Sequence, residues 1–418
     1  MQAPETLAGA AWLKAPATRA VFKALDGKAG RTRAVGGIVR DTLLGIGRAD
    51  IDMATEFKPK EVMARAEAAG LTAHPTGIAH GTITLVHQGN PIEVTTLRRD
   101  IETDGRRAVV RFGTDWADDA ARRDFTMNAV YAFANGKLFD PLGGVEDCLA
   151  RRVRFIGHPD DRIKEDYLRI LRFFRFFAVY GDGRPDAEGL KACARLKAGL
   201  AQLSAERVWG ELKKLLGAED PSRALLWMRT AAVLGEVLPE SEKWGIDSIH
   251  SLSATGHELG WPPDPLLRLM AIVPPRAERV ASLAKRLKLA KAESKRLDTW
   301  AASELPPPGT NDEALMRLLY RGEPDGIADR LRLAIARARG AHEPAAEAAY
   351  QRLVALTGAY ARPKFPLKGK DLVARGMVPG PEVGRRLKRL EDAWVESGFT
   401  LGRKQLLAKI GVAGWRPR

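Results

Sequence analysis

The first third of the chain switches between two hydrophobic periodicities. Residues 32–37 and 49–55 are short runs in which polar and apolar positions alternate, a period that predicts strands. Residues 38–45 and 58–70 instead place apolar side chains three or four positions apart, and each run ends in a glycine, which predicts helices. Pro59 near the start of the second run fits the first turn of a helix.

Two further segments have the pattern of β-hairpins. Residues 81–98 contain two alternating runs around Gln-Gly-Asn-Pro, and residues 130–144 place Asn-Gly between apolar runs. Asn-Gly favours the tight turn that joins antiparallel strands. Together with the segments above, these hairpins predict an α+β region built on a small sheet.

From about Asp160 onward the pattern becomes almost wholly helical. Proline clusters interrupt it at 260–266 and 304–311, where either domain boundaries or helix–helix turns are expected. We predict an α+β fold, with a small mixed sheet and helices at the N-terminus followed by an all-helical remainder. The predicted parts are a head at 1–150, a neck at 151–216, a body at 217–303 and a basic tail at 304–418.

Composition narrows the class of protein. The net charge is +15, from 67 Lys and Arg against 52 Asp and Glu, and this surplus favours a polyanionic partner. Two cysteines, Cys148 and Cys193, have no metal-binding spacing, which predicts a reduced, cytoplasmic protein. No apolar run approaches the length of a membrane span, and the N-terminus lacks the pattern of a signal peptide.

Asp50 and Asp52 stand two residues apart on the predicted strand 49–55. Residues at that spacing face the same side of a strand, so both carboxylates are expected to project together, with Ile51 facing the other way. Paired carboxylates suit a hard divalent cation, most often Mg²⁺ in phosphate chemistry. Taken alone, the pair also fits a solvated strand end. Glu93, on a later strand, is a third candidate carboxylate, with a solvent-facing role as its alternative.

A glycine turn precedes this pair. Gly36 and Gly37 end one strand and lead into a helix, a geometry that lets a phosphate approach backbone N–H groups. Arg40 in the first turn of that helix can add a charge-assisted contact. Followed by the two aspartates, this turn describes a nucleoside triphosphate held against a metal.

Seven motifs stand in a fixed order: VGGIVRD, RADIDMAT, TGIAHGTIT, IEVTTLRRD, RRDFTMNA, EDYLRILRFFRF and SAERVWGEL. As an ordered set they resemble the bacterial class II CCA-adding enzymes, the tRNA nucleotidyltransferases of the polymerase-β-like superfamily. The resemblance is dense from about residue 31 to 215 and thin beyond it. It implies template-independent addition of CCA to the 3′ end of tRNA from CTP and ATP, with release of pyrophosphate and two Mg²⁺ ions.

The resemblance also implies roles for single residues. Asp50 and Asp52 match the catalytic, metal-binding aspartates. The third predicted catalytic carboxylate, Glu93, rests on its strand position beside Thr95 and not on the resemblance. Asp166 and Arg169 match the pair that reads the base. The remaining predicted nucleotide-binding residues are Gly36, Gly37, Arg40, Arg122, Arg123, Asp124, Asn128, Arg172 and Arg175.

The spacing and chemistry of the acid and the arginines between residues 166 and 175 agree with those roles. Asp166, Arg169, Arg172 and Arg175 recur every third position, which on one helix makes a slowly winding polar stripe. An ordinary solvated helix face is the alternative. Cytosine and adenine both present an amino donor beside a ring-nitrogen acceptor, so a carboxylate and a guanidinium match either base. Guanine and uracil present the reverse pattern and would leave buried polar groups unpaired.

Other function classes fit less well. The chain has no Walker P-loop, no His-Asp dipeptide and no HExxH motif. A poly(A) polymerase of the same family and an enzyme adding only CC or only A remain open, and a non-catalytic RNA-binding protein is the least favoured reading. The expected partners are the tRNA acceptor end, CTP and ATP. Lys- and Arg-rich helices after about residue 274 are expected to contact the tRNA backbone, and neither a membrane nor a protein partner is expected.

Overall fold

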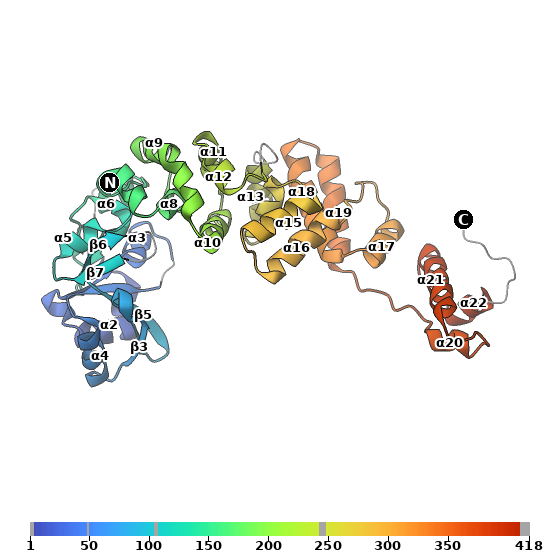
Figure 1. Ribbon diagram of the computed structural model, residues 1–418, viewed down its shortest axis with the longest axis horizontal. Helices are drawn as coiled ribbons and strands as arrows, with labels where there is room; N and C mark the ends of the chain where they lie inside the picture. The colour runs from blue at the N-terminus through green and yellow to red at the C-terminus, as the bar shows by residue number, and fades with distance from the viewer. Residues whose placement is uncertain (1–3, 48–49, 104–107, 242–247, 410–418) are drawn as a thin grey trace. The chain divides into compact units, whose positions relative to one another are not determined.

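The computed structural model describes residues 4–47, 50–103, 108–241 and 248–409 (Figure 1). The chain divides into two compact units, residues 1–242 and residues 243–418. The first unit contains the sheet, and the second is helical throughout its described part. This arrangement confirms the predicted α+β class. The finer division into head, neck, body and tail stays a prediction.

A mixed seven-stranded sheet forms the centre of the first unit, in the order β3-β4-β5-β2-β1-β8-β9. All its pairs are antiparallel except β2–β5, which is parallel. A separate antiparallel pair joins β6 and β7. The strands are β1 Thr32–Val35, β2 Asp52–Thr55, β3 Thr72–Gly77, β4 Thr82–His87, β5 Asn90–Thr96, β6 Arg98–Thr103, β7 Ala108–Phe112, β8 Tyr131–Ala132 and β9 Leu138–Phe139.

Both predicted hairpins are present. β4 and β5 flank a turn at Gln88 and Gly89, which have φ of 49° and 79°. A type I′ turn requires positive φ at both central residues, so this pair fits the right-handed twist of the strands. β8 and β9 pair across the Asn135-Gly136 turn.

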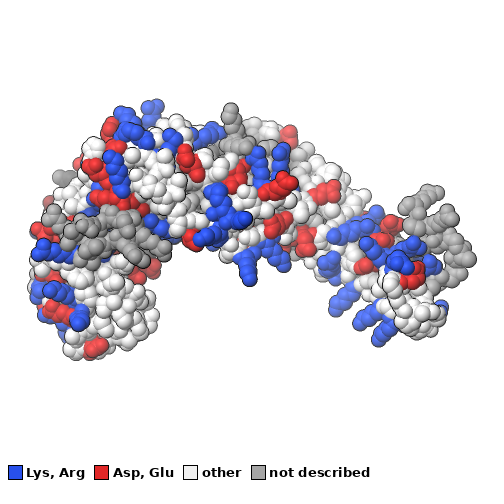
Figure 2. Space-filling model, in the orientation of Figure 1, with Lys and Arg blue, Asp and Glu red and all other residues white. Residues whose placement is uncertain are grey.

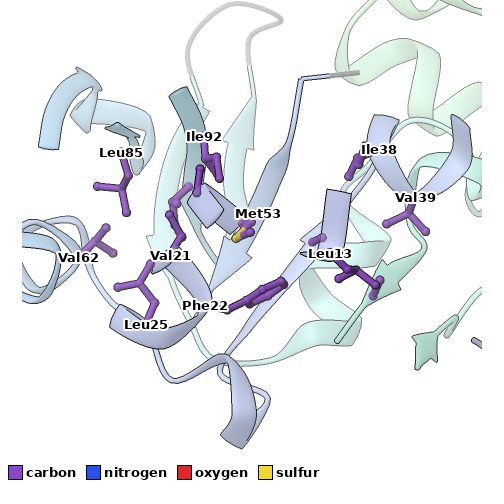
Figure 3. Close-up of a cluster of buried hydrophobic side chains, with 14 of the residues drawn as sticks. Leu13, Val21, Phe22, Leu25, Ile38, Val39, Met53, Val62, Leu85 and Ile92 are labelled. Atoms are coloured by element: carbon purple, nitrogen blue, oxygen red, sulfur yellow. The ribbon is translucent and has the colours of Figure 1, made fainter. Parts of the chain in front are cut away.

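Alternating side chains of the strands enter two cores on opposite faces of the sheet. Met53 packs into a large core with α2 and α4, whereas the next residue, Ala54, packs into a smaller core with Trp116 and Tyr131. Figure 3 shows the large core, where Met53, Ile92 and Leu85 from the strands lie near Val21 and Val62 from the helices. Asp52 therefore lies on the side of the smaller core, because its side chain points the same way as that of Ala54.

The first unit continues with helices after the sheet. Its α-helices are α1 Ala11–Lys14, α2 Pro16–Ala24, α3 Gly37–Leu43, α4 Pro59–Ala68, α5 Trp116–Ala121, α6 Gly144–Leu149, α7 Pro159–Glu165, α8 Leu168–Tyr180, α9 Ala187–Leu196, α10 Ala205–Leu216, α11 Ser222–Thr230 and α12 Val233–Val237. Short 3₁₀ helices are η1 Gly27–Ala29, η2 Ile78–His80, η3 Thr126–Asn128 and η4 Lys197–Gln202. Helices α8 and α10 pack against each other.

The second unit consists of α13 Ser248–Glu258, α14 Pro265–Ile272, α15 Ala277–Arg286, α16 Lys291–Ala302, α17 Asp312–Arg321, α18 Pro324–Gly340, α19 Pro344–Gly358, α20 Gly369–Val373, α21 Pro381–Glu396 and α22 Arg403–Ala408. Both proline clusters lie inside this unit as helix–helix connections, between α13 and α14 and between α16 and α17. Among the residues described, no helix combines the length and apolar character needed to cross a membrane.

Candidate active site

The glycine turn lies where β1 meets α3, as predicted. Gly36 has a φ of +71°, a left-handed backbone conformation that strains any residue with a Cβ atom. Gly36 and Gly37 both line a polar cavity of about 480 Å³ in the first unit. This turn therefore exposes backbone to the cavity at a position where only glycine fits without strain.

Two carboxylates face each other across the parallel strands. Asp52 on β2 is in register with Glu93 on β5, so both side chains point to the same side of the sheet. Burial raises the pKa of Asp52 to about 6, and the negative charges of Glu93 and Asp50 add to this rise against the opposing charges of Arg123 and Arg40. Burial and the neighbouring carboxylates thus outweigh the two arginines in disfavouring the charged form of Asp52.

Asp50 lies outside the strand. The sequence predicted a strand from 49 to 55, but β2 begins only at Asp52, and Asp50 is an exposed residue before it. Ile51 faces the large core, as expected. The argument from strand alternation therefore does not apply to Asp50. Its closeness to Asp52 is seen instead in the electrostatic effect of Asp50 on the Asp52 pKa.

These carboxylates suit a divalent cation. Carboxylate oxygens are the ligands that Mg²⁺ prefers, and a cation beside the buried Asp52 would offset the cost of charging it. No three His, Cys, Asp or Glu side chains of the described segments gather into a ready-made metal site. Mg²⁺ is commonly held by one or two carboxylates together with water and substrate phosphates, so two aspartates fit that mode of binding.

Arg40 lies buried at the floor of the cavity, with three different side chains as partners. Its Nε donates to Asp41 at 2.8 Å, its Nη1 to Asn128 at 2.6 Å and its Nη2 to the hydroxyl of Tyr180 at 2.6 Å. The guanidinium also lies 3.9 Å from the centre of the Tyr180 ring. Arg40 is therefore a fixed positive charge beneath the glycine turn.

The Arg-Arg-Asp sequence follows α5 and divides its members between two networks. Arg122 and Arg123 both bind Asp119, at 2.6 and 3.0 Å, and Asp119 also accepts a hydrogen bond from Tyr131. Burial opposes ionisation of Asp119, but the two arginines hold its pKa below the usual range. Arg123 lines the cavity, whereas Arg122 does not.

Asp124 belongs to the second network. Its Oδ1 accepts hydrogen bonds from the amide group of Asn128 and from the backbone N–H of Phe125, and its Oδ2 accepts from Nε of Arg172 at 2.8 Å. Burial opposes ionisation of Asp124 too, yet Arg172 and these donors keep its pKa below the ordinary value. Asp124, Asn128 and Arg172 all line the cavity.

Asp166 and Arg169 both line the cavity near the N-terminus of α8, but only Arg169 lies on that helix. The sequence predicted a single helical stripe from Asp166 to Arg175, and this prediction is wrong at its first member. Helix α7 ends at Glu165, Asp166 is extended with φ of −157°, and α8 begins at Leu168. The Asp166 carboxylate accepts the N–H of Leu168, which is the contact by which aspartate favours a helix start.

The arginines of α8 then diverge. Arg169 donates to Glu165 and to the backbone oxygen of Arg162, and it lines the cavity. Arg175 instead pairs with Glu211 on α10 at 2.6 Å and does not line the cavity. The predicted apolar side chains of this helix, Leu168, Leu171, Phe174 and Phe177, are all buried.

Sequence reasoning missed three residues of this region. Arg207 on α10 lines the cavity and donates to Asp166 at 2.6 Å, although the sequence analysis gave SAERVWGEL no chemical role. Phe176 lines the cavity, and Tyr180 binds Arg40. The two aromatic residues looked like ordinary core positions of an amphipathic helix, so only the structure identifies them.

The cavity therefore joins the glycine turn, one of the predicted catalytic acids and the predicted base-reading pair. Its lining residues are Gly36, Gly37, Arg40, Asp52, Arg123, Asp124, Asn128, Asp166, Leu168, Arg169, Arg172, Phe176 and Arg207. Asp50, Glu93, Arg122 and Arg175 are predicted site residues that do not line it. The glycine turn and Arg40, which suit phosphate groups, line the cavity together with Asp52. Asp166 and Arg169, which can hydrogen-bond a base, line it too, and this combination suits a nucleotide.

Strands β6 and β7 follow the IEVTTLRRD motif and pair with each other, whereas residues 104–107 between them lie outside the described part of the chain.

Comparisons with known proteins agree with this geometry. A family model described as the poly A polymerase head domain matches residues 32–154. A second model, described as a probable RNA and SrmB-binding site of polymerase A, matches residues 184–244. The first segment includes the sheet and the second includes α10, whereas α8, which supplies several lining residues of the cavity, lies between the two.

Whole-chain relatives are more specific. The chain is 34% identical over 397 residues to a Mus musculus protein named CCA tRNA nucleotidyltransferase 1, mitochondrial, covering 90% of this chain and 86% of that protein. It is 40% identical over 194 residues to the CCA-adding enzyme of Geobacillus stearothermophilus, which is 46% of each chain. A crystal structure of the Bacillus stearothermophilus CCA-adding enzyme in complex with CTP is similar with a TM-score of 0.71 and 25% identity, over 95% of this chain and 98% of that one. The family predicted from the ordered motifs is confirmed, and the chain belongs to the CCA tRNA nucleotidyltransferases, the CCA-adding enzymes.

Proposed function

We propose that this chain is a nucleotidyltransferase that adds CCA to the 3′ end of tRNA, using CTP and ATP and releasing pyrophosphate. The observation that carries this function is the single cavity that joins Gly36 and Asp52 at one end to Asp166 and Arg169 at the other. The names of the whole-chain relatives and the CTP complex of the similar crystal structure support it. The reaction is attack of an RNA 3′-hydroxyl on the α-phosphate, with pyrophosphate as the leaving group.

Enzymes of this family depend on divalent metal, and we propose Mg²⁺ held by Asp50 and Asp52 as the form used here. When bound, the metal would neutralise charge on the triphosphate and lower the pKa of the attacking hydroxyl. The raised pKa of Asp52 supports this assignment, because burial and the charges of Glu93 and Asp50 outweigh those of Arg123 and Arg40, and a bound cation would relieve that cost. Glu93 would add negative potential in the same register, even though it does not line the cavity.

The chain's own side chains would orient the nucleotide. Backbone N–H groups at Gly36 and Gly37 would approach the phosphates, with the fixed charge of Arg40 beneath them. Arg123 would add a second positive charge from its place against Asp119. Since phosphoryl transfer relies mainly on positioning and electrostatics, these fixed charges would supply most of the rate enhancement.

Asp166 and Arg169 would select the base. A carboxylate accepts the exocyclic amino group of cytosine or adenine, and a guanidinium donates to the neighbouring ring nitrogen. In the structure, Asp166 contacts Arg207 and Arg169 contacts Glu165. These partners fix the two groups in place, which supports selection without a nucleic-acid template.

We propose that the C-terminal helices bind the tRNA backbone, in keeping with a head at 1–150, a neck at 151–216, a body at 217–303 and a tail at 304–418. Lys and Arg side chains gather over α20 to α22 (Figure 2). Lys368, Lys370, Arg375 and Lys388 are exposed in this region. Such a surface suits phosphate contacts that do not depend on sequence.

We also propose the cytoplasm as the location of this protein. Cys148 and Cys193 are free and buried, which agrees with a reducing compartment. The Mus musculus relative has a name that specifies mitochondria, so the proposed location rests on the cysteines alone.

The assay that tests the function offers single nucleotides to tRNA that lacks its CCA end. We expect addition of CTP first, then of one A after two C residues, read on a gel of end-labelled tRNA. The family model over residues 32–154 is named after poly(A) polymerase, so that activity is the second candidate. Long tails from ATP alone, or failure to use CTP, would exclude CCA addition and favour the polymerase.

A further inference from the structure

A closed ring of side-chain contacts surrounds the floor of the cavity. Each member contacts the next by a hydrogen bond or by an aromatic contact, and the last contacts the first. The members, in order, are Arg40, Asn128, Asp124, Arg172, Phe176 and Tyr180.

One half of the ring consists of hydrogen bonds. Nη1 of Arg40 donates to Asn128 at 2.6 Å, the amide of Asn128 donates to Asp124 at 2.9 Å, and Nε of Arg172 donates to the same carboxylate at 2.8 Å. This half ties α3 and the segment after α5 to the middle of α8. Asn128 and Asp124 are both buried, so these bonds are shielded from water.

The other half is aromatic. The Arg172 guanidinium lies 5.4 Å from the centre of the Phe176 ring, and the Phe176 and Tyr180 rings lie 5.4 Å apart, tilted by 47°. The Tyr180 hydroxyl then accepts Nη2 of Arg40 at 2.6 Å. Arg40 and Arg175 also lie near the Phe176 ring, at 5.3 and 4.5 Å from its centre.

Within this ring, helix α8 is attached to the other elements at two separate points. One is Arg172, which binds Asp124, and the other is Tyr180, the last residue of the helix, which binds Arg40. Tyr180 lies eight positions after Arg172 along the helix, which is about 12 Å at 1.5 Å per residue. The Tyr180 contact therefore adds to the restraint on the direction of the helix that Arg169, Arg175 and its buried apolar side chains also provide.

We propose that Tyr180 is a positioning residue that sets the distance between the phosphate end and the base-reading end of the nucleotide site. It acts through Arg40, which lies beneath the glycine turn, and through the direction of α8, which carries Arg169 at its start. The proposal rests on the assignment of this cavity to a nucleotide. Tyr180 itself does not line the cavity, so its effect passes through Arg40 and Phe176.

The test compares Tyr180→Phe with Tyr180→Leu. Phenylalanine keeps the ring packing but leaves Nη2 of Arg40 without the hydroxyl, and leucine removes the ring as well. For Tyr180→Phe we expect a nucleotide KM raised about ten-fold for CTP and ATP alike, the size of effect typical for loss of a hydrogen bond to a charged group. Discrimination against UTP should fall, whereas the KM for tRNA and kcat at saturating nucleotide should change little.

Tyr320→Phe is the matched control. Tyr320 and Tyr180 are both 9% exposed, and the Tyr320 hydroxyl also has a charged partner, Glu391, but in the second unit. The control should leave the nucleotide KM unchanged. Thermal unfolding of each variant separates loss of stability from loss of positioning, and Tyr180→Leu should show the larger change in both measurements.

Direct titration of CTP without tRNA keeps this proposal separate from the proposed function. If the unaltered enzyme fails to add CTP to tRNA, the proposed function is wrong, while CTP affinity still reports on the cavity. An unchanged CTP affinity, nucleotide KM and UTP discrimination in Tyr180→Phe would overturn the positioning role. So would a loss of stability in Tyr180→Leu with none of those three quantities changed.

Discussion

Arg207 holds the carboxylate of Asp166 from another helix, with Nη2 of Arg207 at 2.6 Å from Oδ2 of Asp166. The other carboxylate oxygen accepts the N–H of Leu168 at 3.1 Å. Both oxygens are therefore engaged, and the orientation of the acid that we assign to base reading is set by two contacts from different elements. An acid held in this way presents its remaining lone pairs in one direction only.

Removal of Arg207 should weaken base selection. In Arg207→Met the Asp166 side chain keeps only its hydrogen bond from the N–H of Leu168. The carboxylate can then rotate, so it discriminates less well between the amino group of C or A and the carbonyl of G or U. We expect GTP and UTP to enter at least ten-fold more readily relative to CTP, from a loss on the order of 1.4 kcal/mol of discrimination. The measurement is kcat/KM for each nucleotide with tRNA that lacks CCA.

Arg195→Met is the matched control for that experiment. Arg195 also binds an aspartate, Asp160 at 2.5 Å, but this pair is exposed and lies away from the cavity. The control should leave the ratio of nucleotides unchanged. If Arg207→Met also keeps the C and A preference, Arg207 has no part in selection.

Asp52→Asn should stabilise the protein in the absence of metal and abolish nucleotide addition. Burial and nearby carboxylates raise the Asp52 pKa to about 6, so the folded state favours the protonated form. Stability from this group is present below its unfolded pKa of about 4 and is lost as pH rises through 6. At pH 7 the neutral amide removes a cost of up to about 3 kcal/mol, from about two pKa units at 1.36 kcal/mol each.

The measurement is thermal or urea unfolding at pH 7 in chelator. Asp119→Asn serves as the comparison of opposite sign, because the arginines beside Asp119 hold its pKa low despite burial and its ionised form stabilises the fold. A lower midpoint for Asp52→Asn than for the unaltered chain would contradict the assignment of unbalanced negative charge to this site.

The need for Mg²⁺ should grow as pH falls. Protons and the cation compete for the Asp52 carboxylate, so the Mg²⁺ concentration that gives half-maximal activity should rise about ten-fold for each pH unit below 6. Above pH 7 it should become nearly independent of pH. A titration of activity with Mg²⁺ at pH 5, 6, 7 and 8 checks this. Acid loss of activity that saturating Mg²⁺ does not restore would mean that another group limits the rate.

The basic surface of the C-terminal helices should control tRNA affinity through salt. Neutralising Lys370, Arg375 and Lys388 with glutamine should lower the slope of log affinity against log salt by roughly one for each phosphate that the variant no longer binds. CTP affinity should stay unchanged. Binding of labelled tRNA between 50 and 200 mM salt is the measurement, and glutamine at the exposed Lys60 of α4 is the control. An unchanged slope in the triple variant would show that these side chains are only solvated.

Local pattern predicted most of the secondary structure near the site. Residues within a few positions of one another determine the glycine turn before α3, the hairpin of β4 and β5, and the helices α3 and α4. Period, caps and turn residues act at that range, so a single sequence contains them. The ordered motifs also predicted the family, because their order and spacing extend over most of the first unit.

The errors arose where a local pattern had two structural outcomes. EDYLRILRFFRF has helical spacing throughout, but Asp166 can begin a new helix by accepting the N–H of Leu168, and in the structure it does so. The partners of the site residues were also out of reach. Arg207, Glu165 and Tyr180 are common residue types on helices, and nothing in their own neighbourhood indicates which distant side chain they bind.

The contacts of Asp166 with Arg207 and of Arg169 with Glu165 also change how a reversal of base preference should be designed. A plain exchange, Asp166→Arg with Arg169→Asp, would set a guanidinium against Arg207 and a carboxylate against Glu165. Like charges at those distances would displace both groups. A design that reverses the preference therefore requires that the two partners, Arg207 and Glu165, be exchanged as well.

The order of the strands has a consequence for synthesis on the ribosome. Ala34 in β1 pairs with Ala132 in β8, about 100 residues later, and Asp52 in β2 pairs in parallel with Glu93 only after α4, β3 and β4 have intervened. The acids of the site are thus made early, but the strands that align them arrive late. Long-range pairs of this kind form slowly, since a long loop must close first. Until β8 has been made and has left the ribosome, one edge of β1 lacks its strand partner, so we expect chaperones to bind this protein mainly before that point.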